Sequence, residues 1–102
     1  MASPIPHPGR EEIRIEAVLH ALADPVRLRI VRSLAEHEEG ISCGALDLGI
    51  TASTLTHHVR TLREAGVVRV RPRGTSRISS LRREDLDALY PGLLNGVLAA
   101  RR

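Results

Sequence analysis

Apolar residues recur with helical spacing over the first third of the chain. Between positions 11 and 23 they fall at the i, i+3, i+4 and i+7 positions of one helix face. These positions are Ile15, Val18, Leu19 and Leu22. A second helix is expected to begin after Asp24, because aspartate is a good N-cap. Pro25 then fits the first helical position, where its missing N–H costs nothing.

A short segment and a longer one follow, at about residues 42–65. The segment "SCGALDLG" allows a short helix of roughly two turns that ends at Gly49. Thr51 is expected to cap a longer helix that runs to about Ala65, with Gly66 at its C-terminal end. A short helix, a turn containing glycine and a longer helix are typical of a helix-turn-helix.

The spacing changes from helical to alternating in "VVRVRPRGTSRISSL", at about residues 67–81. The inward positions are predicted to be Val68, Val70 and Ile78, with Ser80 as a further candidate. The outward positions are predicted to be Arg69, Arg71, Arg77 and Ser79. This pattern indicates a hairpin with "PRGTS" at its tip, and Pro72 places the end of its first strand at an edge or in a turn.

A last helical segment is expected over about residues 82–100. One face of it is shared by Leu86, Leu89, Leu93 and Val97. Pro91 lies inside this segment and should kink or split the helix near Tyr90, because proline removes a backbone hydrogen bond. The order of elements predicts a mainly α domain with a small β-hairpin wing, which is a winged helix-turn-helix.

The domain is predicted to span residues 11–102, preceded by an N-terminal arm at residues 1–10. The arm, "MASPIPHPGR", has three prolines and no apolar core, so we expect it to be disordered and not to be a signal peptide. No stretch approaches the roughly 18 apolar residues of a membrane span, and no membrane partner is expected. A single cysteine excludes an internal disulfide and is typical of a reducing cytoplasm.

The apolar core must be thin, because the chain has 102 residues and Tyr90 is its one aromatic side chain. A thin core favours burying more surface against a second copy of the chain. We therefore expect a homodimer joined through the first and last helices. The predicted interface residues are Ile15, Val18, Leu19, Leu22, Leu89, Leu93, Leu94, Val97 and Leu98.

Positive charge is concentrated in one third of the chain. Residues 51–83 hold eight arginines and one acid, a net charge of +7, whereas the whole chain carries +3. Such a contiguous basic segment is expected of a nucleic-acid surface. The alternative interpretation is a solvated basic face with no partner.

Candidate DNA contacts lie on the longer helix and on the wing. On a helical wheel, Ser53, His57 and Arg60 fall opposite the apolar face, in the half of a recognition helix that reaches base edges. The predicted DNA-binding residues are Ser53, Thr54, Thr56, His57 and Arg60 on the helix and Arg71, Arg73 and Arg77 on the wing.

The adjacent His57 and His58 project about 100° apart, so they are poorly placed to bind one metal ion together. His58 borders the apolar face, where it either packs and caps or contacts a backbone phosphate. Cys43 has three interpretations: buried packing, a candidate thiol sensor at a helix start, or a metal ligand with His37.

Two stretches, "LHALADPVRLRIVRSLAE" and "TASTLTHHVRTLREAGVVRVRPRGTSRISSLR", resemble the ArsR-type winged-helix transcriptional regulators over about residues 13–98. The resemblance implies a dimer built from the first and last helices, operator DNA as partner and repression relieved by a signal. Metal-sensing members are expected to carry a Cys-x-Cys type motif in the helix-turn-helix, or paired histidine and acid ligands on the last helix. This chain has neither, so we expect no metal and no cofactor.

The sequence thus predicts a sequence-specific repressor that binds a palindromic operator as a dimer in the cytoplasm. Two alternatives remain open: a winged-helix protein-interaction module, and a regulator that responds to a small apolar ligand between the terminal helices or to thiol modification. An enzyme is not expected, because no glycine-rich phosphate loop, paired carboxylate site or nucleophile–base pair is present.

Overall fold

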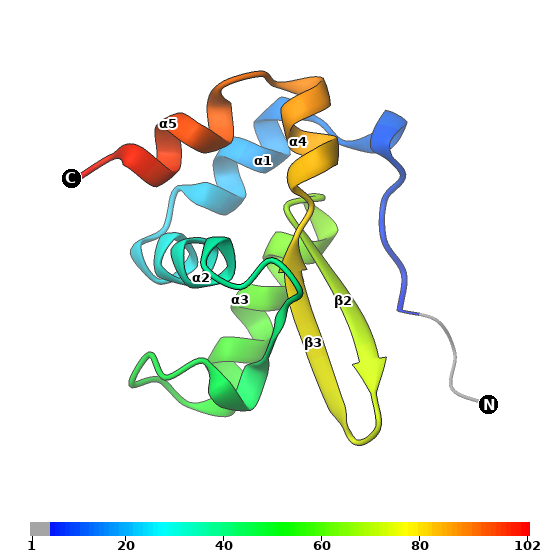
Figure 1. Cartoon of the computed structure of the whole chain (residues 1–102), viewed down its shortest axis with the longest axis vertical. Coiled ribbons are helices and arrows are strands. Elements are labelled where there is room, and N and C mark those ends of the chain that lie inside the picture. Colours follow the sequence, from blue (N-terminus) through cyan, green and yellow to red (C-terminus); the bar gives the residue numbers. More distant parts are fainter. Residues whose placement is uncertain (1–4) are drawn as a thin grey trace.

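The computed structural model describes residues 5–102 and places a helical layer beside a small antiparallel sheet (Figure 1). The elements are η1 (Arg10–Glu12), α1 (Ile15–Leu22), α2 (Pro25–Ala35), β1 (Ile41–Ser42), η2 (Cys43–Ala45), α3 (Ala52–Glu64), β2 (Val68–Arg73), β3 (Ser76–Leu81), α4 (Arg83–Leu89) and α5 (Leu93–Ala99). Helices α1, α4 and α5 lie together at one end, and the β2–β3 hairpin extends away from them beside α3 (Figure 1). The predicted winged helix-turn-helix architecture is therefore confirmed.

The predicted caps hold the two longest helices. The carboxylate of Asp24 accepts hydrogen bonds from the N–H groups of Val26 and Arg27, at 2.9 and 3.0 Å. These bonds keep the pKa of Asp24 below its usual value. Thr51 accepts from the N–H of Thr54 at 3.2 Å and starts α3. Local side chains therefore set where both helices begin.

Helix α1 begins at Ile15, later than the predicted start near residue 11. The preceding residues form a single 3-10 turn, η1, and then an extended Ile13. Ile13 is 8% exposed in the core, and its carbonyl oxygen accepts a hydrogen bond from the Tyr90 hydroxyl at 3.2 Å. Burial of this side chain takes the chain out of the helical path before α1 begins.

The predicted two-turn helix before α3 is wrong. The segment forms only the 3-10 turn η2, and residues 46–51 are not helical. Gly44 and Gly49 lower its helix propensity, and Gly49 adopts a left-handed backbone conformation. Leu46 is 7% exposed and anchors the segment to the core.

The sheet has three strands in the order β1–β3–β2, so the wing hairpin is joined by a short third strand. Val70 pairs with Ser79 and Arg71 pairs with Ile78. Because paired residues share a face, Ser79 lies on the core side with Val70, and Ile78 lies on the opposite side. The predicted outward Ser79 is therefore wrong, whereas Ile78 is buried as expected, at 7% exposed, but on the other face of the sheet. Ser79 is fully buried, and its strand β3 lies between β1 and β2.

The last helical segment is split, as its proline predicts. Helix α4 ends at Leu89 and α5 begins at Leu93, with Gly92 in a left-handed conformation between them. The expected helix over residues 82–100 is thus two short helices that pack against each other at an angle (Figure 1).

Three residues predicted for the dimer interface are already buried within one chain. Val18, Leu22 and Leu94 are 0%, 6% and 2% exposed. They pack against the core because α1 contacts α2 and α3, and α5 contacts α2. Ile15 and Leu19 remain exposed, and the other predicted interface residues are half-buried: Leu89, Leu93, Val97 and Leu98. Across residues 5–102, no helix has both the length and the apolar character to cross a membrane.

The end of the N-terminal arm lies against the domain. Residues 5–10 belong to the segment predicted to be disordered. Residues 5–9 are extended and Arg10 begins η1, and together they contact β2, α3 and α4, whereas residues 1–4 lie outside the described part of the chain. Pro8 accepts a hydrogen bond from the buried Arg82 at 2.6 Å. Such contacts between distant segments carry no local sequence signal.

Candidate nucleic-acid interface

Helix α3 presents one buried face and one polar face, as the helical wheel predicts. Leu55, Val59 and Leu62 are buried in the core. The predicted contact residues Ser53, Thr54, Thr56, His57 and Arg60 are all exposed. The polar face therefore lies in solvent along the length of the helix.

The hydroxyl groups of α3 are engaged at its N-terminal turns. Thr51 Oγ1 donates to Thr54 Oγ1 at 2.8 Å, and Thr56 Oγ1 donates to the carbonyl of Ala52 at 2.9 Å. Each hydroxyl oxygen can still accept a further hydrogen bond, and a hydroxyl can rotate to donate elsewhere. This part of the helix can thus offer both donors and acceptors to a partner.

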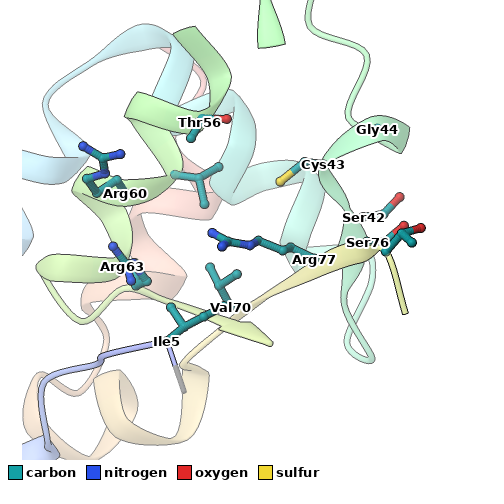
Figure 2. Close-up of a pocket in the computed structure, with 12 residues that line it drawn as sticks. Ile5, Ser42, Cys43, Gly44, Thr56, Arg60, Arg63, Val70, Ser76 and Arg77 are labelled. Atoms are coloured by element: carbon teal, nitrogen blue, oxygen red, sulfur yellow. The ribbon is translucent and has the colours of Figure 1, made fainter. Parts of the chain in front are cut away.

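A cleft of about 580 Å³ separates α3 from the wing. Figure 2 shows Arg77 reaching across it from β3 toward α3, with Arg60 and Arg63 on the opposite wall. Val59 and Val70 form an apolar floor. The cleft therefore has a basic rim over an apolar base.

Arg77 and Arg71 point to opposite sides of the hairpin. Arg77 pairs with Pro72 on the α3 side, whereas Arg71 pairs with Ile78 on the other side. Arg71 donates to the carbonyl of Glu39 at 2.9 Å, so it braces the loop before β1. Arg73 is exposed at the hairpin tip. The structure brings Arg60 and Arg77 together and separates Arg71 from them.

Acidic groups neutralise one end of the basic segment and leave the other end positive. Asp85 lies 2.7 Å from Arg10, 2.9 Å from Arg82 and 3.7 Å from Arg69. The hydrogen bond from Arg10, followed by that from Arg82, lowers the pKa of Asp85. Within residues 5–102, no carboxylate lies within 4.0 Å of the guanidinium groups of Arg60, Arg73 or Arg77. These three cations remain available to an anionic partner.

The adjacent histidines have different surroundings, although their ring centroids lie 5.7 Å apart. The His57 ring lies in solvent, whereas His58 is half-buried, with its Nδ1 3.2 Å from Arg27 Nη1 and 4.0 Å from Asp24. The packing interpretation of His58 is therefore the one that the structure supports. In the described part of the chain, no three histidine, cysteine or acidic residues gather as a metal site would require.

Arg27 is a structural residue that the sequence did not reveal. It is 9% exposed, and its Nε donates to the carbonyl of Ala21 at 2.6 Å. Its guanidinium also reaches His58 on α3, so it joins the end of α1 to α3. Helical periodicity alone could have placed Arg27 toward the interior, but not named its partners.

Cys43 is half-buried, and its sulfur points into the cleft between α3 and the wing (Figure 2). The side chain also packs against the hydrophobic core, so both the packing interpretation and the thiol-sensor interpretation of Cys43 stay open. Its thiol shares the cleft with Arg60 and Arg77.

Comparisons with known proteins agree with this architecture. Residues 22–71 match a family model described as a helix-turn-helix domain. The chain is 34% identical over 86 residues to the uncharacterized HTH-type transcriptional regulator YceK of Bacillus subtilis, covering 82% of this chain and 85% of that protein.

Solved structures show the same fold. The transcriptional repressor BigR from Xylella fastidiosa superposes with a TM-score of 0.66 at 28% identity, covering 86% of this chain and 88% of that one. A crystal structure of an ArsR family transcriptional regulator also gives a TM-score of 0.66, at 20% identity, covering 80% of this chain and 90% of that one. The chain therefore belongs to the HTH-type transcriptional regulators, and it has the winged-helix fold of the ArsR family protein.

Proposed function

We propose that this regulator binds a palindromic DNA operator as a homodimer, with α3 in the major groove and the wing beside it. The observation that carries the proposal is the cluster of unpaired arginines beside the exposed face of α3. Arg60 and Arg77 line the cleft, and Arg73 stands at the wing tip. Phosphate contacts position such a protein on DNA, and side chains in the groove read the bases.

The α3 face would supply the base contacts, through Ser53, Thr54, Thr56, His57 and Arg60. The wing would contact phosphate or the minor groove through Arg73 and Arg77, since narrow A·T tracts attract arginine. Arg71 is a weaker candidate than the sequence indicated, because its guanidinium is bonded to the loop before β1.

The dimer would join the exposed side of α1 to the half-buried side of α5. Ile15 and Leu19 are 39% and 49% exposed, which is high for large apolar side chains. A two-fold axis through these helices would place two α3 helices about one DNA turn apart, ~34 Å. The operator would then be an imperfect palindrome, and the protein would act in the cytoplasm.

The experiment is binding to a DNA duplex that the wild-type protein selects from a randomised library. His57→Ala and Arg60→Ala should weaken specific binding by about 1–3 kcal/mol each. Arg73→Ala should flatten the log–log salt dependence by about one unit for each phosphate contact that is lost. Arg29→Ala removes an exposed arginine on α2 and serves as the charge-matched control. If the α3 variants bind like wild type, α3 is not the reading helix.

Thiol regulation is a second proposal, favoured by the position of Cys43 in the cleft. A group attached to its sulfur would stand between α3 and the wing, where the DNA backbone would pass. Cys43→Ser should therefore abolish any loss of DNA binding caused by a thiol oxidant. An unchanged oxidant response in this variant would exclude Cys43 as the sensor.

A further inference from the structure

The free edge of the wing is covered by the N-terminal arm. Strand β2 is an edge strand, because β3 lies between it and β1. The N–H of Val70 points away from β3 and donates to Nε2 of His7, at 2.9 Å. A side chain from the arm thus takes the place of a missing neighbouring strand.

Two further hydrogen bonds hold the arm at residues 5–8. Arg63 of α3 donates to the carbonyl of Pro6 at 3.3 Å, and Arg82, at the start of α4, donates to the carbonyl of Pro8 at 2.6 Å. Ile5 lines the cleft beside Val70 and Arg63 (Figure 2). Residues 5–8 therefore contact the α3 helix, the wing and α4 at once.

We propose that residues 5–8 form a clasp that holds the wing in its orientation relative to α3, with His7 as the positioning residue. This proposal rests on the proposed function, because the orientation matters only if both elements contact DNA together. An isolated two-stranded hairpin is marginally stable, and β1 contacts β3 through only two residues. The clasp adds support on the other edge, next to the wing arginines.

The contact requires a neutral His7 ring, because a protonated imidazole has no acceptor nitrogen. Partial burial lowers the pKa of His7, and the charges of Arg69, Arg63 and Arg82 lower it further, against a backbone hydrogen bond at Ile5 that raises it. Asp85 lies within 4.0 Å of Arg82 and Arg69, and it is also bound to Arg10.

The contact between His7 and Val70 should depend on pH. A histidine whose pKa is lowered on docking contributes fully above its ordinary value of about 6.5. The contribution is lost as the pH falls from there through the lowered pKa. The clasp should therefore be closed at pH 8 and open in mild acid.

The experiment compares His7→Ala and His7→Gln with wild type. A glutamine can place an acceptor oxygen near the position of Nε2, whereas alanine cannot accept. His20→Gln removes an exposed histidine on α1 and is the matched control. The two readouts are hydrogen exchange of the Val70 amide, and affinity at pH 8 and pH 5 for the duplex selected by wild type.

At pH 8, His7→Ala should accelerate Val70 exchange by about ten-fold and weaken DNA binding by about ten-fold, with a flatter salt dependence as wing contacts are lost. His7→Gln should restore both within about two-fold and should lose less affinity between pH 8 and pH 5 than wild type or His20→Gln. Circular dichroism should show the same helix content in all variants.

Faster Val70 exchange in His7→Ala with unchanged DNA affinity would overturn the positioning role, since the arm would then be only structural. A wild-type pH dependence in His7→Gln would overturn the assignment of His7 as the titrating group. If the wild-type protein selects no duplex at all, the proposed function fails, and the amide exchange then reports on the arm contact alone.

Discussion

Replacing Arg27 should destabilise the domain far more than replacing any exposed arginine. Its guanidinium donates to the carbonyl of Ala21 at 2.6 Å, to His58 Nδ1 at 3.2 Å and to the carbonyl of His20 at 3.4 Å. The residue is 9% exposed, so water cannot fully replace these partners. Arg27→Ala removes the donor and leaves the buried Ala21 carbonyl without it.

The magnitude follows from the lengths of these contacts. A hydrogen bond from a charged donor contributes about 1.5–3 kcal/mol, and only the bond to Ala21 is short enough to count in full. The longer contacts and the lost packing of the side-chain stem add to it, for a total of about 3 kcal/mol. Arg29→Ala, on the exposed side of the same helix, should change stability by less than about 0.5 kcal/mol.

Urea denaturation at one fixed protein concentration measures both variants, because dimerisation would otherwise shift the apparent stability. Arg27→Met separates the two contributions. It keeps an apolar stem and loses the hydrogen bonds, so it should be nearly as unstable as Arg27→Ala. A methionine variant as stable as wild type would refute the reasoning, since packing rather than hydrogen bonding would then account for the effect.

Four other expectations can be checked with similar assays. Gly66→Ala should lower the free energy of unfolding in urea by about 2–4 kcal/mol, because a Cβ there would lie 2.5 Å from buried Ile13. Gly74 also has a left-handed backbone but faces open space, so Gly74→Ala should lower it by only about 1 kcal/mol. Equal losses of stability in the two variants would contradict this reasoning. Asp85→Asn should cost about 1–2 kcal/mol at pH 7, and the difference from wild type should vanish as the pH falls below about 4 through the lowered pKa. Ser79→Ala should leave stability unchanged or raise it by up to about 1 kcal/mol, because its buried hydroxyl has no partner in the described chain. Leu19→Glu should give a folded monomer in sedimentation at micromolar concentration with weakened DNA binding, and a persistent dimer would exclude α1 from the interface.

The elements with strong local chemistry could be predicted from the sequence. Asp24 and Thr51 cap their helices as expected, because a side-chain oxygen needs only the next two or three N–H groups. The exposed face of α3 follows from helical periodicity, and the break between α4 and α5 follows from the missing N–H of Pro91. The candidate α3 residues Ser53, Thr54, Thr56, His57 and Arg60 all lie on that exposed face.

Errors arose where a strand or helix depends on more distant neighbours. Ser79 is buried because β3 lies between two strands, and alternation along β3 cannot say which of its faces meets the core. The segment at residues 42–49, predicted as a helix, forms only a single 3-10 turn. Its two glycines disfavour a helix, and the burial of Leu46 holds the non-helical segment against the core. Val18, Leu22 and Leu94 are apolar on the expected faces, but those faces are already covered within one chain.

By itself, therefore, the sequence determined the caps, the exposed polar face of α3, the basic wing and the family. Only the tertiary structure decided that Arg77 faces α3 while Arg71 turns away, that Arg27 joins α1 to α3, and that His7 closes the edge of the wing. The physical reason is the range of the forces. A cap or a periodic face is set within a few residues, whereas the contact of His7 with Val70 joins groups 63 positions apart. Such a contact forms only after the core has brought the two segments together.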